Sequence, residues 1–102
     1  MRRAMIGAWM ALPLVLAPAA AADTDSDYAA RLHTVGIYGQ KDYNAWLAKI
    51  TCKRLSTGLD VDASESATFL TMNLPQASTE QVWQFLGIAI QMYCPNHLGA
   101  LT

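Results

Sequence analysis

The chain has 102 residues, of which 53% are hydrophobic, and its formal net charge at pH 7 is −1. This charge balance argues against nucleic acid as a partner, because phosphates require a concentrated stripe of Lys and Arg. It argues equally against binding to an anionic membrane surface. The length suffices for one small domain, whose limited core would gain stability from a covalent crosslink.

The N-terminal segment has the three-part pattern of a secretory signal peptide. Two arginines follow Met1, an apolar run extends over residues 4–17, and Ala20 and Ala22 are small residues at the positions that a signal peptidase recognises. An uncleaved membrane anchor is the alternative, but the apolar run is shorter than the roughly 20 residues that a membrane span needs. We therefore predict a signal peptide at residues 1–22.

Cleavage after Ala22 would leave residues 23–102 as a single helical domain, secreted or held in the cell envelope, with no stable membrane span. Loss of the two arginines leaves five basic and eight acidic side chains, a formal charge of −3. Two cysteines, Cys52 and Cys94, remain in a chain bound for an oxidising compartment. We predict that they form a structural disulfide.

The first predicted helix covers about residues 26–35, where Tyr28 and Leu32 lie on the same side. Gly36 is expected to end this helix in a left-handed conformation. Ile37 would then fold back onto Leu32, as in a Schellman ending.

The second predicted helix covers about residues 43–56, with Asp42 as its N-cap and Gly58 as its stop. Leu59, directly after the stop, would make a return contact with the helix. Helical spacing predicts one apolar face that contains Tyr43, Trp46, Leu47 and Ile50.

A third helix is predicted over about residues 64–73. Asp62 and Glu65 supply its opening signal, and Ala67 and Leu70 would line one side. Pro75 follows its end.

The fourth predicted helix, about residues 79–94, is the most strongly patterned segment and the one that the other helices must cover. Ser78 and Gln81 form a capping box at its start, and Pro95 marks its end. Its apolar face contains Val82, Phe85, Leu86, Ala89, Ile90 and Tyr93. Since no run of strict alternation predicts a strand, the expected fold class is all-α, a four-helix domain with the last helix packed against the other three.

Several of these residues together resemble a known family. The set combines Leu32-x-x-x-Gly36-Ile37, Cys52-x-x-Leu55-x-x-Gly58, Ser78-x-x-Gln81 and Tyr93-Cys94-Pro95. It is similar to a family of small secreted mycobacterial and other actinobacterial proteins that is catalogued as a domain of unknown function. The resemblance covers roughly residues 27–98 and implies a helical domain with one disulfide. It implies no activity, substrate or cofactor.

Catalytic and metal-binding patterns are sparse in the sequence. His33 and His97 are the only histidines, and neither lies in a local frame typical of a nucleophile and its base. No C-x-x-C, H-x-x-x-H or H-E-x-x-H spacing predicts a metal site. We therefore expect no catalytic residue, no metal and no cofactor, and a small hydrolase is the least favoured function.

Aromatic residues are abundant for so small a domain. Their simplest interpretation is the core, but a helical bundle can also enclose a flat apolar ligand. A small hydrophobic-ligand or haem carrier, with a cavity lined by Trp46, Trp83 and Tyr93, is therefore the alternative. The preferred hypothesis is an exported, non-catalytic interaction domain whose partner is an unidentified protein or small molecule.

Overall fold

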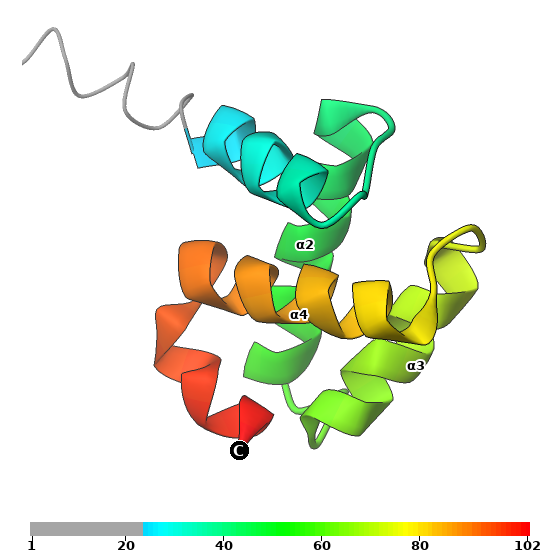
Figure 1. The fold of residues 1–102 in the computed structure, drawn as a ribbon. Coiled ribbons are helices and arrows are strands. Elements are labelled where there is room, and N and C mark those ends of the chain that lie inside the picture. The colour runs from blue at the N-terminus through cyan, green and yellow to red at the C-terminus, as the bar shows by residue number, and fades with distance from the viewer. Residues whose placement is uncertain (1–23) are drawn as a thin grey trace, which may run out of the picture.

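The computed structural model describes residues 24–102 and places them in an all-α fold (Figure 1). The predicted signal peptide at residues 1–22 lies outside the described residues. The helices span 24–34, Lys41–Ser56 (α2), Ala63–Asn73 (α3), Thr79–Tyr93 (α4) and, as a 3₁₀ helix, Pro95–Leu101 (η1). Within this part of the chain there is no strand, so the predicted fold class is confirmed. Only η1 was not expected, because the segment after Pro95 carries no strong periodicity.

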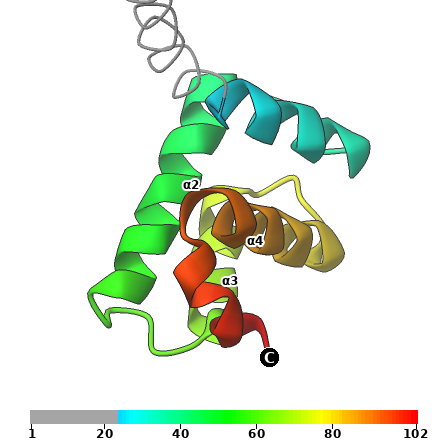
Figure 2. The ribbon, with the colours of Figure 1, turned by 90° about the vertical axis from the view of Figure 1, so that its left-hand side faces the viewer.

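Two views of the ribbon show how the helices are arranged. The first helix (residues 24–34) and α4 cross the same side of α2, while α3 packs beside α4 and α2 (Figures 1 and 2). Arg31 of the first helix donates a hydrogen bond to Gln91 of α4 at 2.8 Å. In the described range 24–102, no helix has both the length and the apolar character to cross a membrane.

The predicted capping signals of α3 and α4 are confirmed. Ser78 Oγ accepts from the Gln81 amide at 3.1 Å, and the Gln81 side chain accepts from the Ser78 amide at 2.9 Å, which completes the capping box. Asp62 accepts from the Glu65 amide at 3.0 Å. These bonds satisfy backbone donors that have no partner within the first turn of a helix.

The end of the first helix is also as predicted. Gly36 has a φ of 81°, and the Ile37 amide donates to the Leu32 carbonyl at 2.9 Å. Both Ile37 and Leu32 are buried, so the turn returns an apolar side chain to the core. In contrast, the predicted cap at Asp42 is wrong: α2 begins at Lys41, and Gln40 stands at its N-cap without a side-chain cap bond.

The predicted apolar face of α2 is confirmed at Leu47 and wrong at Tyr43 and Trp46, which are exposed. Trp46 is 54% exposed, whereas the buried positions of the helix are Asn44, Ala45, Leu47, Ala48, Thr51 and Cys52. Small side chains on the inner face let α4 approach closely, and Cys52 Sγ lies 3.9 Å from the Ala89 carbonyl oxygen. Thr51 is tolerated in the interior because its hydroxyl donates to the Leu47 carbonyl at 2.9 Å.

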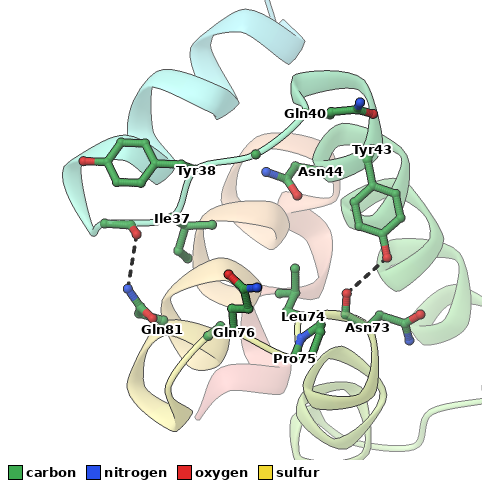
Figure 3. Close-up of a pocket in the computed structure, with 13 residues that line it drawn as sticks. Ile37, Tyr38, Gln40, Tyr43, Asn44, Asn73, Leu74, Pro75, Gln76 and Gln81 are labelled. Atoms are coloured by element: carbon green, nitrogen blue, oxygen red, sulfur yellow. Dashed lines mark hydrogen bonds between the residues drawn. The ribbon is translucent and has the colours of Figure 1, made fainter.

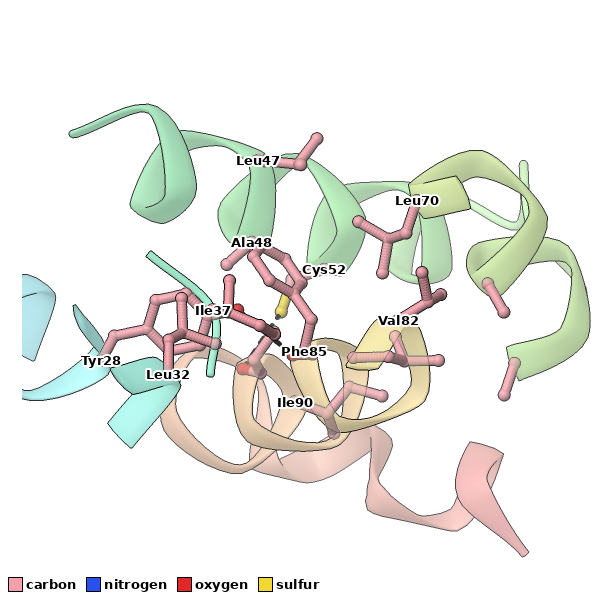
Figure 4. Close-up of a cluster of buried hydrophobic side chains, with 14 of the residues drawn as sticks. Tyr28, Leu32, Ile37, Leu47, Ala48, Cys52, Leu70, Val82, Phe85 and Ile90 are labelled. Atoms are coloured by element: carbon pink, nitrogen blue, oxygen red, sulfur yellow. Dashed lines mark hydrogen bonds between the residues drawn. The ribbon is translucent and has the colours of Figure 1, made fainter. Parts of the chain in front are cut away.

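The core forms around α4. Its predicted face is confirmed, with Val82, Phe85, Leu86, Ala89 and Ile90 all buried (Figure 4). The first helix covers this face with Tyr28, whose hydroxyl donates to the Phe85 carbonyl at 3.1 Å and whose ring meets that of Phe85 edge to face. Burial of a tyrosine here requires that bond, since an unpaired hydroxyl in the interior is costly.

A disulfide joins Cys52 of α2 to Cys94 at the end of α4, with the two Cα atoms 5.9 Å apart. Both residues are buried. The bond therefore fixes the later half of α2 to the end of the central helix.

A buried ion pair closes the connection between α2 and α3. The Asp60 carboxylate is 3% exposed, and Arg54 donates two hydrogen bonds to it, each 2.9 Å long. Ser66 of α3 donates a third at 3.0 Å. The preceding residue, Leu59, is 63% exposed, so its predicted return contact with the helix is wrong.

Candidate functional site

The larger described hollow lies where three connections meet (Figure 3). One wall comes from the turn after the first helix, a second from the start of α2, and a third from the link between α3 and α4. Its volume is about 590 Å³. The lining residues are Gly36, Ile37, Tyr38, Gly39, Gln40, Tyr43, Asn44, Asn73, Leu74, Pro75, Gln76, Ala77 and Gln81.

Local backbone chemistry explains why the hollow forms here. Gly36 and Gly39 both have positive φ, 81° and 119°, so the chain turns twice between the first helix and α2. On the opposite wall, Pro75 lacks an amide hydrogen and follows the end of α3. Both connections therefore turn at this place, and the hollow lies between them.

Two hydrogen bonds brace the walls. The Tyr43 hydroxyl donates to the Asn73 carbonyl at 3.1 Å and joins α2 to the end of α3. The Gln81 amide donates to the Val35 carbonyl at 3.1 Å and joins α4 to the end of the first helix. These bonds preform the hollow rather than leaving it to a ligand to assemble.

The lining carries no charged side chain. Its polar groups are amides and phenol hydroxyls, and its apolar surface comes from Ile37, Leu74, Pro75 and Ala77. Such a site would pay a large desolvation cost for a charged ligand that it cannot pair. The lining therefore favours a neutral ligand.

Asn44 is the most informative residue in the hollow. The residue is only 5% exposed and its carboxamide makes no hydrogen bond to any residue in the range 24–102, but the amide atoms are open to the hollow, because no fully buried side-chain N or O atom in that range lacks a partner. Its carboxamide points between the two connections, towards the space that Gln76 faces from the other side (Figure 3). A carboxamide has two donors and an acceptor, and these remain available to a molecule in the hollow. Such a molecule must replace the solvent contacts of the amide with hydrogen bonds of its own.

The three residues predicted to surround a flat ligand do not line either described hollow. Trp46 and Trp83 are 54% and 40% exposed, because the small residues of α2 and the aliphatic face of α4 fill the interior. Tyr93 packs edge to face on Tyr28 instead, with their ring centroids 5.3 Å apart. The expected cavity lined by these three residues is therefore not among the described hollows.

Tyr93 takes part in a polar cluster beside the first helix. Its hydroxyl donates to Asp25, and Lys49 pairs with the same carboxylate at 3.2 Å. The Tyr93 hydrogen bond and the Lys49 ammonium hold the pKa of Asp25 below its ordinary value. Desolvation by burial raises the pKa of Tyr93, and Asp25 raises it further. These contacts tie the first helix to α2 and α4, so the cluster has a structural role.

Neither histidine lines the hollow. His33 is exposed and packs against the Tyr38 ring, with a centroid separation of 4.8 Å. His97 of η1 lies 3.0 Å from Ser56 Oγ, measured from its Nε2. Across residues 24–102, no third residue hydrogen-bonds to the His97 ring. In that same range, no three His, Cys, Asp or Glu side chains gather as a metal site.

Comparison with known proteins identifies the family. The chain matches a family described as "Protein of unknown function (DUF732)" over residues 22–96. The chain belongs to this family. The resemblance inferred from the cysteine and capping patterns is confirmed.

Two proteins of Mycobacterium tuberculosis are similar to this member of DUF732. They are the uncharacterized protein MT0585 of strain CDC 1551 / Oshkosh and the uncharacterized protein Rv0559c of strain ATCC 25618 / H37Rv. Each is 53% identical over 98 residues, which cover 95% of this chain and 88% of the relative. No solved structure matches the chain.

Sequence reasoning missed Asn44 and the hollow. Asn44 was overlooked because it lies in the first turn of α2, where a polar residue normally faces water. The sequence carried one signal of the hollow, namely two turns. Gly36 and Gly39 mark the first turn and Pro75 marks the second, and both turns lie next to the start of α2 in the fold.

Proposed function

We propose that the protein is an exported, non-catalytic interaction domain that binds its partner in the hollow next to Asn44. The observation that carries this proposal is the Asn44 carboxamide, which is 5% exposed and has no hydrogen-bond partner among the described residues. Thr51 and Asp60 are paired within the protein, whereas the Asn44 amide is open to the hollow and is therefore available to hydrogen-bond a ligand there.

The proposal of a non-catalytic role draws on the position of the histidines. The Ser56 and His97 pair joins the end of α2 to η1, and neither residue lines the hollow. A serine becomes a useful nucleophile when its base is in turn oriented by a third group, and the described residues supply none to His97. We assign this pair to the packing of η1 on α2.

The proposal of export draws on two independent features. The N-terminal segment has the basic, apolar and small-residue order of a signal peptide. The Cys52–Cys94 disulfide belongs to proteins that mature outside the reducing cytosol. Intact-mass analysis of the protein recovered outside the cytoplasm should give an N-terminus at Asp23 and two fewer hydrogens than the dithiol. A full-length reduced chain confined to the cytosol would refute export.

Site-specific photo-crosslinking in producing cells tests the binding site. A photoreactive phenylalanine analogue placed at Tyr38, which lines the hollow and is 68% exposed, should give a discrete adduct. The matched control is the same analogue at Val61, which is 76% exposed and does not line the hollow. Identical adduct patterns at both positions, or no adduct at Tyr38, would contradict a binding role for this hollow.

A further inference from the structure

We infer that the hollow takes a neutral saccharide of one or two sugar rings, held through its hydroxyl groups by Asn44 and Gln76 and covered on one face by Tyr43. This inference rests on the proposed binding function and specifies the chemistry of the ligand. It draws on the absence of charge in the lining, the unpaired amides and the position of the tyrosine ring.

The lining excludes most other classes of small ligand on electrostatic grounds. None of its 13 residues is charged, so a phosphate, carboxylate or amine would lose its hydration without gaining an ion pair. A wholly apolar ligand such as a hydrocarbon meets the opposite difficulty. It would seal Asn44 from water and leave the carboxamide unpaired.

Vicinal hydroxyl groups match the free amides. A hydroxyl both donates and accepts, and a carboxamide offers both functions side by side, so two neighbouring sugar hydroxyls can bind one Asn44 side chain. Gln76 has no side-chain hydrogen bond to any residue between 24 and 102 and faces the same space. By contrast, Gln81 is already engaged at both ends, with Ser78 and Val35, so it shapes the wall.

The apolar part of the lining suits the carbon–hydrogen face of a sugar ring. Tyr43 forms one side of the hollow, and its orientation is fixed by the bond from its hydroxyl to the Asn73 carbonyl. Leu74 and Pro75 continue this surface below it. An aromatic ring that keeps a fixed position loses little conformational entropy when a ligand packs on it.

A peptide is the less suitable occupant. One common mode of peptide recognition adds a strand to an exposed sheet edge, and the hollow is walled by helices and turns. The side-chain amides of Asn44 and Gln76 therefore supply the specificity.

The test is an NMR titration of the oxidised, ¹⁵N-labelled protein with methyl glucoside, maltose and cellobiose as probes. At least one probe should give saturable shifts at the amides around Asn44 and Gln76. Asn44→Leu keeps the side-chain size and removes the carboxamide, and it should weaken binding about tenfold or more, the loss expected from about two hydrogen bonds. Asn96→Leu is the matched control, because Asn96 is exposed on η1 outside the hollow. It should leave the affinity unchanged.

Gln76→Ala provides the decisive second variant if Asn44→Leu fails to fold, since Gln76 is exposed in a connection. It should weaken binding several-fold. The saccharide inference is overturned if no probe gives saturable shifts, if the shifts lie outside the hollow, or if neither variant changes the affinity. Should an adduct at Tyr38 be found while every saccharide fails, the hollow remains a binding site and only the ligand class is refuted.

Discussion

Removal of the disulfide should destabilise this domain more than any single core contact. Cys52 and Cys94 are separated by 42 residues in the sequence. In the chain-entropy model, a crosslink across a loop of that length stabilises the folded state by about 4 kcal/mol at 25 °C. A domain of this size has a total stability of only about 5–10 kcal/mol, so the bond supplies a large share. Since about 1 kcal/mol shifts the Tm of such a domain by about 4–8 °C, reduction should lower the Tm by about 15–30 °C.

Thermal unfolding followed by circular dichroism measures this effect. The oxidised protein should be compared with the protein in reductant, and with a variant that carries both Cys52→Ala and Cys94→Ala. The reductant should lower the Tm of the wild-type protein and leave the Tm of the double-alanine variant unchanged. This comparison separates the loss of the disulfide from general effects of the reductant. A fall of less than about 5 °C on reduction would refute the reasoning, because it would mean that the reduced chain is already restricted by residual structure.

Three further predictions follow from the buried groups. Asp60→Asn should lower the free energy of unfolding, measured in urea, by about 2–3 kcal/mol, because Arg54 would lose its charged partner. The control Asp27→Asn, at an exposed residue, should change it by less than about 0.5 kcal/mol. Equal effects of the two substitutions would contradict a stabilising role for the Arg54–Asp60 pair. Burial raises the pKa of Tyr28 in the folded protein above its ordinary 10.0. The Tyr28 hydroxyl therefore ionises at a lower pH in the unfolded chain than in the folded one. The free energy of unfolding should fall above pH 10 by about 1.4 kcal/mol per pH unit from this group. Urea titrations at pH 9 to 11 should show this slope reduced in Tyr28→Phe, and an unchanged slope would count against it. Haem titration should give no saturable Soret shift; a shift that Tyr43→Phe abolishes would revive the carrier hypothesis.

Much of the fold follows from local signals in the sequence. The capping pairs at Ser78 and Asp62 and the glycine at 36 were predictive because each acts through neighbouring backbone groups. The face of α4 was predictable because a helix covered on most sides has a wide apolar stripe. The disulfide needed only two cysteines and an export signal.

The α2 face and the site were not predictable in the same way. Hydrophobicity placed Trp46 inside, but close approach of α4 requires small residues, and that requirement appears only when two helices meet. Asp60 is buried because Arg54 and Ser66 converge on it from different helices. Asn44 faces a space that exists only after distant turns come together. Each of these features depends on tertiary contacts, which periodicity does not encode.

The disulfide restricts one wall of the hollow and leaves the opposite wall free to move. The bond closes a ring that contains α3 and all of α4, so the wall made by residues 73–77 lies within the cross-linked segment. The opposite wall, residues 36–40, lies outside the ring and is retained by side-chain packing and by hydrogen bonds such as that from Gln81. Thermal breathing would therefore widen the hollow by displacement of the first helix, while the ring keeps its shape. Entry and release of a bound molecule would require only non-covalent contacts to break, and the oxidised frame would survive each cycle.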